Sequence, residues 1–477
     1  MILQPISRLR KYLAENGALF LSEISDKNSG GCYMVGESVR DFFLARPTNI
    51  INIFVTESAI NMSKTFLKYV KNGEIIAIED NNVVYIKGER LEFKIINFKH
   101  TKAATSLNYD VTRQITSYQK TQDFTINSMA INLQKEYFGE LEDPFGGYED
   151  LKEGIIRTTN DPMITFVNDA IQMINGIRLA TTFNYKIEDE TFHAMQDNAN
   201  NLKFVRTENM IAELNKIILS PVPSIGFVYL HNTGLLKEFL PELSALDIVE
   251  TFNGRKHKNN FYHTLEVLDN IAKREGNLWL RWAAILHDIG KTHCKRWDPV
   301  IGWTFHNHNF IGEKMVPGIF KRLKLPMDDR MRFVKKLVGL HMRPIAIADD
   351  IVTDSAVRRL LFEAGNDINS LMLLCEADIT SKNEMRKKKF LQNFKIVREK
   401  LAKIEEKDRI RKFQPPVDGI EIMKMFNLQP CKEIGIIKGA LKDAIIDGKI
   451  PNERDAALDF VIKKAASIGL SPITFIK

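Results

Sequence analysis

Residues 35–55 read VGESVRDFFLARPTNIINIFV. A turn of small residues leads into Val39-Arg40-Asp41, an apolar run follows, and Arg46-Pro47 precedes the β-branched run Ile50–Val55. Branched apolar side chains in a short run are typical of a strand, because they pack well on a pleated, buried surface. The stretch therefore predicts a turn followed by a strand of a small α/β sheet.

Length and composition limit the class of protein. A chain of 477 residues is too long for one ordinary core and is expected to hold three or four domains. With 44% hydrophobic and 27% charged residues it has the composition of a soluble globular protein. No run of about 18 apolar residues occurs, so we expect no transmembrane helix. No signal peptide is evident either.

Charge and cysteines add two weaker constraints. The net charge of +7, from 67 basic and 60 acidic residues, permits binding to a polyanion and is equally ordinary for solubility. The four cysteines are widely scattered, which predicts neither a disulfide framework nor a zinc cluster and favours a reducing cytoplasm.

The hydrophobic period changes along the chain. Residues 1–20 predict an amphipathic helix, and residues 30–135 are strand-rich. Strands are predicted at Ile50–Val55, Glu74–Ile78, Val83–Lys87, Leu91–Ile96 and Ile155–Thr158, with a Pro/Gly turn at Asp143–Gly147. From about residue 161 the period is helical to the end, with helices predicted at 166–183, 206–219, 222–234, 243–251, throughout 260–383, and from 385 to 411, where Gln414-Pro415-Pro416 precedes a last helical module.

The helical half carries a concentration of histidines. Seven of the ten histidines lie between residues 257 and 341. Imidazoles and carboxylates are ligands that suit Mn²⁺, Fe²⁺, Co²⁺ or Ni²⁺. Such an ion lowers the pKa of a water molecule and polarises a phosphoryl oxygen. A lone histidine on a helix is far more often an ordinary core or surface residue than a ligand. The evidence for a metal site is therefore the whole set in its order along the chain, which is His263, His287-Asp288, His308, His341 and Asp378.

The ordered set resembles the motif of the HD superfamily of metal-dependent phosphohydrolases. The resemblance implies that His263, His287, Asp288 and Asp378 hold one metal. It implies that His308 and His341 complete a second site or bind phosphate, with His306 as a neighbouring alternative to His308. His257 and His293 are predicted not to be ligands. Lys291, one helical turn past Asp288, is placed to contact a phosphate, although a solvated lysine is an equally good interpretation.

The stretch at residues 35–55 resembles the head-domain signature of the tRNA nucleotidyltransferases (CCA-adding enzymes) and bacterial poly(A) polymerases. In that family the turn is Gly-Gly and the strand carries Asp-x-Asp, which holds two metal ions. Two carboxylates at i and i+2 of a strand share one face, and Mg²⁺ prefers such anionic oxygens. Here the second glycine is Glu37, and the two aspartate positions are Ile50 and Asn52.

Other head positions of the family are also changed. Glu92 stands where the third family carboxylate lies, and one carboxylate does not make a two-metal site for Mg²⁺. Thr121–Asn127 resembles a family segment but lacks both of its arginines, keeping Asp123. The base-templating segment matches at Asn168–Asn175, where Asp169 is kept and the two arginines are Gln172 and Asn175. Neutral amides do not replace the bidentate Arg fork. Arg40 is the main family residue of the nucleotide site that is kept. Because the other metal- and nucleotide-binding positions are replaced, the resemblance implies a head that has lost nucleotidyl transfer.

The resemblance covers nearly the whole chain and is to CCA-adding enzymes with an HD domain, of the Bacteroidota type. It implies an α+β multidomain protein. A nucleotidyltransferase-like α/β head with a mixed sheet (1–160) precedes all-α neck (161–252), HD (253–384) and tail (385–477) domains. Family members bind the tRNA acceptor arm through neck and tail, and Arg386, Lys387 and Lys388 can contact phosphates, although a charge run on a helix is usually a solvated face.

Three hypotheses follow. The first is a divergent, cytoplasmic, RNA-binding relative with a lost transferase and an intact HD phosphohydrolase that uses Mn, Ni, Co, Fe or Mg. The second is a still-active CCA- or A-adding enzyme. The third is a non-catalytic tRNA-binding or regulatory subunit, as a homo-oligomer or paired with an intact paralogue. We expect no membrane and no DNA among the partners.

Overall fold

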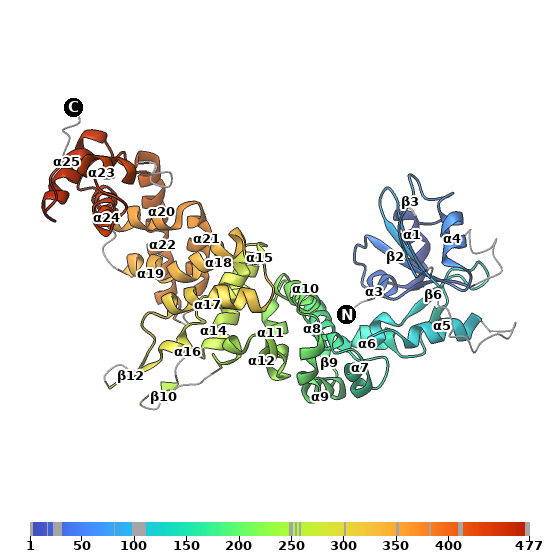
Figure 1. The fold of residues 1–477 in the computed structure, drawn as a ribbon. Coiled ribbons are helices and arrows are strands. Elements are labelled where there is room, and N and C mark those ends of the chain that lie inside the picture. The colour runs from blue at the N-terminus through green and yellow to red at the C-terminus, as the bar shows by residue number, and fades with distance from the viewer. Residues whose placement is uncertain are drawn as a thin grey trace. The chain divides into compact units, whose positions relative to one another are not determined.

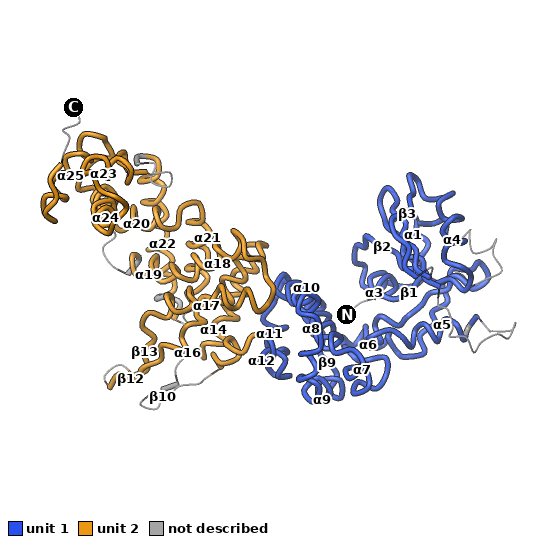
Figure 2. The backbone as a smooth tube through the Cα atoms, viewed as in Figure 1, with its two compact units in different colours: residues 1–239 blue, residues 240–477 orange. Residues whose placement is uncertain are grey.

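The computed structural model describes most of the chain as two compact units. The described residues are 3–16, 18–21, 31–80, 82–97, 111–247, 251–252, 255–256, 259–299, 302–349, 353–380, 383–408 and 414–472. One unit comprises Met1–Phe239 and the other Leu240–Lys477 (Figure 2). The first unit holds the large sheet, and the second is built almost wholly of helices (Figure 1).

A seven-stranded mixed sheet organises the first unit, in the order β3-β4-β5-β2-β1-β6-β7. Strands β2 and β5 are parallel, and every other neighbouring pair is antiparallel. This confirms the predicted mixed sheet. The strands are β1 (Cys32–Val35), β2 (Ile50–Val55), β3 (Glu74–Glu79), β4 (Val83–Lys87), β5 (Glu92–Ile96), β6 (Ala130–Asn132) and β7 (Leu141–Glu142).

Helix α3 (Glu37–Phe43) follows β1 directly and positions the residues after the turn. Gly36 has φ +66°, a conformation that favours glycine, and its amide donates to the carbonyl of Met129. Helix α3 buries Val39, Phe42 and Phe43. The remaining helices of the head are η1 (Ile6–Arg8), α1 (Leu9–Glu15), α4 (Ala59–Phe66), α5 (Val111–Lys120), η3 (Thr125–Asn127) and α6 (Gly147–Glu153). The helix predicted over 1–20 is shorter, because η1 precedes α1 and the last described turn of the helix ends before Asn16.

The turn predicted at Asp143–Gly147 is present and begins α6. Both carboxylate oxygens of Asp143 accept backbone bonds, Oδ1 from the Gly147 amide at 2.7 Å and Oδ2 from the Tyr148 amide at 2.8 Å. A negative charge there also suits the helix N-terminus. A Cβ on Gly147 would lie 2.1 Å from the carbonyl oxygen of Thr125, so only glycine fits against the next segment.

Short helices complete the first unit after the sheet. They are α7 (Pro162–Asn168), α8 (Ile171–Phe183), α9 (Asp189–Asp197), η4 (Ala199–Phe204), α10 (Thr207–Ile218), α11 (Pro223–Asn232) and α12 (Leu235–Phe239). The prediction of one helix over 166–183 is wrong, because Asp169 is extended and separates α7 from α8. Strand β8 (Ile155–Ile156) lies within the strand predicted at Ile155–Thr158, and its parallel partner β9 (Lys186–Ile187) interrupts the predicted helical region.

The second unit contains helices and two short hairpins. The helices are α13 (Pro241–Ser244), α14 (Asn260–Ala272), α15 (Leu278–Leu286), α16 (Lys291–Cys294), α17 (His308–Arg322), α18 (Asp329–Leu340), α19 (Met342–Asp349), α20 (Asp354–Ala364), η5 (Gly365–Asp367) and α21 (Ile368–Asp378). Hairpin β10–β11 joins Thr251–Phe252 to Arg255–Lys256, and hairpin β12–β13 joins Arg296–Asp298 to Gly302–Thr304. The helix predicted over 243–251 is therefore wrong, since α13 ends at Ser244 and β10 begins at Thr251.

The last three helices form a separate apolar core. After the long helix α22 (Glu384–Asp408), they are α23 (Gly419–Phe426), α24 (Lys432–Ile446) and α25 (Arg454–Ala466). The last three helices bury Ile422, Ile437, Leu441 and Val461 against one another. This agrees with the small helical module predicted after Gln414-Pro415-Pro416. No helix among the described residues is long and apolar enough to cross a membrane.

Candidate metal centre and the altered head site

Five helices of the second unit bring six predicted side chains to one place. His263 lies in α14, His287 and Asp288 follow α15, His308 begins α17, His341 follows α18, and Asp378 ends α21. Of these, His287, Asp288 and His341 are at most 2% exposed. Residues up to 115 positions apart in the chain thus share a buried polar cluster.

The ligand atoms fall into two groups of three. His263, His287 and Asp378 form one, and Asp288, His308 and His341 form the other, each with its atoms within 4.8 Å of one another. In the first, Nε2 of His263 lies 2.8 Å from Oδ1 of Asp378. In the second, Nε2 of His308 lies 3.2 Å from Nε2 of His341.

Asp288 connects the two groups. Its Oδ2 lies 3.6 Å from His263 Nε2 and 3.3 Å from His287 Nε2. Its Oδ1 lies 3.3 Å from His308 Nε2 and 3.9 Å from His341 Nε2. The sequence-based assignment placed Asp288 with the first group alone, whereas its two oxygens face both.

Each imidazole is oriented through its other nitrogen. Nδ1 of His287 lies 2.7 Å from the Ala284 carbonyl, and Nδ1 of His308 lies 2.8 Å from the Phe305 carbonyl. Nδ1 of His341 lies 2.8 Å from the Val338 carbonyl. A carbonyl only accepts, so these nitrogens carry a proton, and Nε2 is the atom left to hold a cation when the ring is neutral. This is the arrangement of metal-ligating histidines.

The fourth imidazole uses a hydroxyl in the same way. Nδ1 of His263 lies 2.9 Å from Oγ1 of Thr380, two residues past Asp378. Sequence reasoning missed Thr380, because nothing in one sequence marks a hydroxyl as a partner until α14 and α21 lie side by side.

The electrostatics of the cluster favour a cation. Burial disfavours the imidazolium of His287, but Asp288 and Asp378 outweigh it and raise the pKa of this side chain to about 10. Although burial opposes it, the close contact with His263 and the nearby charge of His287 hold the pKa of Asp378 below its usual range. Burial and the nearby charge of His287 lower the pKa of His341 to about 4. Two ionised, buried carboxylates therefore demand positive charge between them.

Lys291 supplies part of that charge. Its Nζ lies 2.5 Å from Oδ2 of Asp288 and donates to Oδ1 of Asn260 at 3.3 Å. The lysine is thus held at the cluster rather than solvated. The other two histidines considered behave differently, since His306 and His293 are exposed, while His257 lies outside the described residues. The structure brings His308, not His306, to the cluster.

A glycine contact sets the distance between Asp288 and His308. A Cβ on Gly290 would lie 2.2 Å from the His308 carbonyl oxygen and 2.7 Å from the Gly312 amide nitrogen. We predict that Gly290→Ala lowers the free energy of unfolding by about 1–3 kcal/mol, because a backbone contact must open, and weakens divalent-metal binding. Urea unfolding and metal titration measure both quantities.

Gly318 offers the matched control for that substitution. It lies in α17, the helix that begins at His308, and a Cβ there would meet nothing within 4 Å. Gly318→Ala is expected to leave metal affinity unchanged and to stabilise the helix by up to about 1 kcal/mol. Equal metal affinity for the Gly290→Ala and wild-type proteins would contradict the role given to this contact.

In the head, the positions of the family carboxylates lie on adjacent strands. Ile50 on β2 pairs in register with Glu92 on β5. Ile50 is 39% exposed, so an apolar side chain occupies the outward position. Asn52, on the same face, is half-buried, and its backbone N–H donates to Oγ of Ser38 at 2.8 Å. Among the described residues of the head, no three His, Cys, Asp or Glu side chains converge as they do in the second unit.

Arg40 is engaged within the head. It is 5% exposed, and its Nη1 donates to Oδ1 of Asn127 at 2.7 Å. Its Nε donates to Oδ1 of Asp41 at 2.9 Å, and its guanidinium lies over the Phe183 ring, 4.8 Å from the centroid. A neighbouring carboxylate, that of Glu37, lies 3.5 Å from Nη1. The guanidinium is therefore committed to internal partners.

The remaining head residues predicted for nucleotide binding are likewise bonded internally. Oδ1 of Asp123 accepts from the Phe124 amide at 2.8 Å and from Asn127 at 3.0 Å, and burial raises the pKa of its carboxyl. Asp169 is exposed and accepts from Gln172 at 3.0 Å, and Gln172 accepts from Asn175 at 2.9 Å. The two amides that replace family arginines thus form a chain that ends on Asp169.

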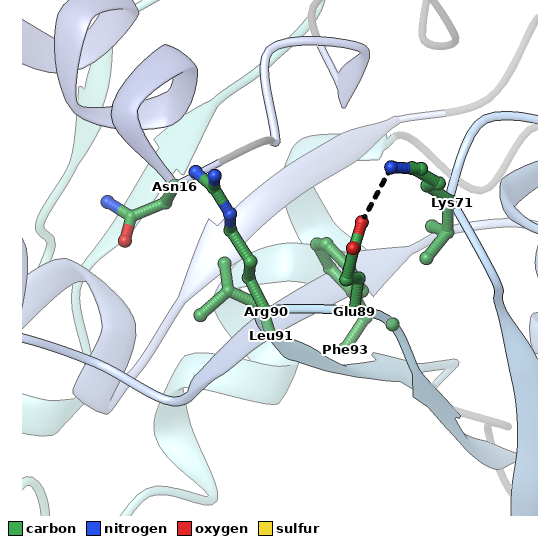
Figure 3. A pocket seen from close by; sticks show the side chains of 8 residues that line it. Asn16, Lys71, Glu89, Arg90, Leu91 and Phe93 are labelled. Atoms are coloured by element: carbon green, nitrogen blue, oxygen red, sulfur yellow. Dashed lines mark ion pairs between the residues drawn. The ribbon is translucent and has the colours of Figure 1, made fainter.

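A cavity of about 290 Å³ lies elsewhere in the head, beside the turn before β5 (Figure 3). Its floor is apolar, and an ion pair of 3.2 Å between Lys71 and Glu89 crosses its rim. The lining residues are Asn16, Val70, Lys71, Gly88, Glu89, Arg90, Leu91 and Phe93. None of the residues predicted to hold metal or nucleotide belongs to this cavity.

Predicted RNA contacts lie at the start of α22. Lys388 is exposed and Lys387 is half-buried, while the side chain of Arg386 lies outside the described residues. The exposure is compatible both with phosphate contacts and with a solvated helix face.

Comparison with known proteins shows the family to which the chain belongs. Family models match it as "Poly A polymerase head domain" over residues 32–157, "Probable RNA and SrmB-binding site of polymerase A" over 184–246, and "HD domain" over 260–383. The A-adding tRNA nucleotidyltransferase of Deinococcus radiodurans is 31% identical over 343 residues, which cover 70% of this chain and 76% of that relative. The chain belongs to the tRNA nucleotidyltransferase family. A CCA-adding enzyme of Streptococcus sanguinis is 25% identical, with 91% of this chain and 93% of the relative covered.

Solved structures of tRNA nucleotidyltransferases share the fold. The Thermotoga maritima CCA-adding enzyme complexed with tRNA has a TM-score of 0.60 at 18% identity, and 98% of this chain and 100% of that chain are covered. The Bacillus stearothermophilus CCA-adding enzyme in complex with CTP has a TM-score of 0.62 at 18% identity, with 95% and 98% covered. These likenesses confirm the predicted α+β multidomain fold.

Proposed function

We propose that this protein is a divergent, RNA-binding member of the tRNA nucleotidyltransferase family that acts as a metal-dependent phosphohydrolase and no longer transfers nucleotides. Its substrate is a phosphomonoester or a 2′,3′-cyclic phosphate, at an RNA end or on a nucleotide. One observation carries the proposal: the HD cluster keeps six convergent ligand groups, whereas the head presents Ile50 and Asn52 where two carboxylates are needed.

The residues of the HD cluster fit a divalent cation. Nε2 of His287 is buried and makes no hydrogen bond, although two carboxylates lie close to it. A buried polar atom without a hydrogen bond is costly unless another group satisfies it. The mixed histidine and aspartate donors suit Mn²⁺, Fe²⁺, Co²⁺ or Ni²⁺, with Mg²⁺ as a further possibility. Bound there, the ion lowers the pKa of a water molecule and polarises a phosphoryl oxygen.

The chain's own residues have three tasks in this proposal. His263, His287 and Asp378 hold one cation position, and Asp288, His308 and His341 hold the other. Lys291 carries positive charge at the edge of the cluster and contacts a phosphate oxygen of the substrate. The buried carbonyls behind the imidazoles fix the direction of each Nε2.

Loss of nucleotidyl transfer is supported by several independent contacts in the head. A triphosphate needs two cations, and these need carboxylates that Ile50 and Asn52 do not provide. Arg40 is occupied by Asn127 and Asp41, and Glu37 adds negative charge beside it. Mg²⁺ in the head is therefore not part of the proposal.

RNA binding rests on the family and on the basic tail. The segment 184–246 matches a probable RNA-binding region, and one structural relative was solved with tRNA. We assign the head to 1–160, the neck to 161–252, the HD domain to 253–384 and the tail to 385–477, with Arg386, Lys387 and Lys388 as phosphate contacts. Four free cysteines support a cytoplasmic location.

Two other functions remain as alternatives. Nucleotidyl transfer is favoured by the 31% identity to an A-adding enzyme, with Glu92 as the one kept carboxylate. A non-catalytic tRNA-binding or regulatory subunit, as a homo-oligomer or beside an intact paralogue, is favoured by the altered head alone.

Two assays on one preparation separate the three functions. The first follows hydrolysis of 2′,3′-cyclic nucleotides and phosphomonoesters with each divalent metal, and the second follows labelled CTP or ATP incorporation into tRNA that lacks CCA. We expect metal-dependent hydrolysis and no incorporation. Incorporation at the rate of a CCA-adding enzyme selects the second function, and inactivity in both assays selects the third.

The hydroxyl behind His263 gives a further prediction. Thr380→Val removes the partner of Nδ1 without changing the side-chain shape, and we expect the metal affinity to fall about tenfold. Thr380→Ser keeps the hydroxyl and is expected to bind metal as the wild type does. Competition with a fluorescent chelator measures both affinities, and equal values for the Val and Ser variants would remove Thr380 from the site.

A further inference from the structure

The hairpin β12–β13 emerges beside the metal cluster. Lys291 lies five residues before β12, and His308 lies four residues after β13. Both connections are short, so the base of the hairpin is tied to two residues of the cluster. Residues 300 and 301 of its turn lie outside the described part of the chain.

One face of this hairpin is aromatic. Trp297 pairs directly opposite Trp303, and their ring centroids lie 5.0 Å apart in an edge-to-face arrangement. Phe305, two residues past Trp303, lies just beyond the end of β13 and three residues before His308. We call these three residues the aromatic strip. Trp297 is 47% exposed, which leaves much of its ring open to solvent.

Lysines accompany the rings toward the cluster. Nζ of Lys295 lies 4.1 Å from the centroid of Trp303, and Nζ of Lys291 lies 5.8 Å from the centroid of Phe305. The same Lys291 amine lies 2.5 Å from Oδ2 of Asp288. Positive charge and aromatic rings therefore run together from the cluster out along the hairpin.

We propose that the aromatic strip is a base-stacking platform, and that the substrate of the HD site is the end of a single-stranded RNA. Its terminal phosphoester lies at the metal cluster, and the bases that precede it stack along the strip. The inference rests on the proposed function and gives it a substrate class. Aromatic rings interleaved with cations bind single-stranded nucleic acid, because every base has a π-face and every link carries a phosphate.

The number of rings decides between an RNA end and a mononucleotide. A single nucleotide needs one ring, whereas the aromatic strip offers three, with Trp297 and Trp303 opposite each other on the two strands and Phe305 beyond β13. Stabilising the hairpin accounts for the edge-to-face pair, since an isolated two-stranded hairpin is marginal. It does not account for the open surface of Trp297 or for the lysines on the same face.

The test compares three substrates that share one reacting group. They are an oligoribonucleotide ending in a 2′,3′-cyclic phosphate, a 2′,3′-cyclic mononucleotide, and a base-free ribose 2′,3′-cyclic phosphate. In each, water adds to phosphorus, one phosphorus–oxygen bond to ribose breaks, and the released oxygen takes a proton. For Trp297→Leu we expect the KM of the oligoribonucleotide to rise about tenfold, with kcat within about twofold. Trp297→Tyr restores the KM, since it keeps a ring.

A matched control lies in the head. Tyr137 is 46% exposed, close to the value for Trp297, and Tyr137→Leu is expected to leave every KM unchanged. A similar KM rise for the base-free substrate overturns the stacking platform. Equal rises for the mononucleotide and the oligoribonucleotide overturn the RNA end and select a nucleotide substrate.

Failure of the proposed function gives a different result. If no substrate is hydrolysed, the affinity for the same oligoribonucleotide, labelled at its 5′ end, is measured by fluorescence anisotropy with Mg²⁺ present. If Trp297→Leu binds this RNA about tenfold more weakly and Trp297→Tyr restores the affinity, the stacking platform is supported and the phosphohydrolase function is contradicted. An unchanged affinity overturns the platform as well.

Discussion

Asp288→Asn is expected to abolish metal-dependent hydrolysis and to empty the HD cluster of metal. The two oxygens of Asp288 face four imidazoles, two in each group, so one neutral amide removes an anionic ligand from both cation positions. Loss of a partner behind a ligand costs about 10–100-fold, and loss of the shared ligand itself should exceed the upper value. We therefore expect kcat/KM to fall more than about 100-fold. Bound metal, measured by elemental analysis after dialysis, should fall to background.

The controls for Asp288→Asn separate chemistry from folding. The substitution preserves side-chain shape, and thermal unfolding shows whether the cluster still packs. Asp354→Ala changes an exposed aspartate at the start of α20 and should leave hydrolysis and metal content unchanged. Undiminished hydrolysis by a folded Asp288→Asn protein would show that the activity belongs elsewhere in the chain.

The metal cluster was largely predictable because its residues are chemically rare and occur in a fixed order. His263, His287-Asp288 and Asp378 could be named from the sequence, although whether they bind metal stays a prediction. The arrangement of Asp288 between two groups was not predictable, because it depends on how α15, α17 and α18 pack. The backbone carbonyls that accept from the imidazole Nδ1 atoms could not be predicted either, since every residue has a carbonyl and the sequence does not mark which ones face a histidine.

The fold shows the same division between local and long-range information. Strand β2 was predicted with its observed bounds, Ile50–Val55, because a β-branched run is a local signal. The hairpin β12–β13 was missed, although Asp298-Pro299 and Gly302, which has φ +86°, are turn signals. The hairpin was missed because the helical period of residues 260–383 predicts helices throughout this region.

Arg40 shows what a sequence cannot reveal about a surviving motif residue. From the sequence it was the group most able to hold a nucleotide. Its partner Asn127 lies 87 positions away, and only the packing of η3 against α3 brings the two together. A residue kept at a family position can therefore serve the fold instead of the reaction.

The second large effect concerns the head. We expect the wild-type protein to incorporate CMP or AMP into tRNA lacking CCA at least about a thousandfold more slowly than the Streptococcus sanguinis CCA-adding enzyme under the same conditions. Two metal ions contribute several kcal/mol to such a reaction, and about 4 kcal/mol corresponds to a factor of about a thousand. Labelled-nucleotide incorporation resolved on a denaturing gel measures the rate. Comparable rates would contradict the loss of transfer.

Restoring the carboxylates tests the reason for that loss. In Ile50→Asp/Asn52→Asp, two carboxylates stand beside Glu92, because Ile50 and Glu92 are in register on neighbouring strands. We expect the variant to gain Mn²⁺ binding in the head, measured by electron paramagnetic resonance in a background where Asp288→Asn has emptied the HD cluster. Ile50→Asn in the same background adds polarity without charge and should gain none. Transfer should stay absent in the restored variant, because Gln172 and Asn175 still lack the guanidinium forks that select a base. Recovery of transfer by the two aspartates alone would show that the amides suffice, and that the metal ligands were the one missing part.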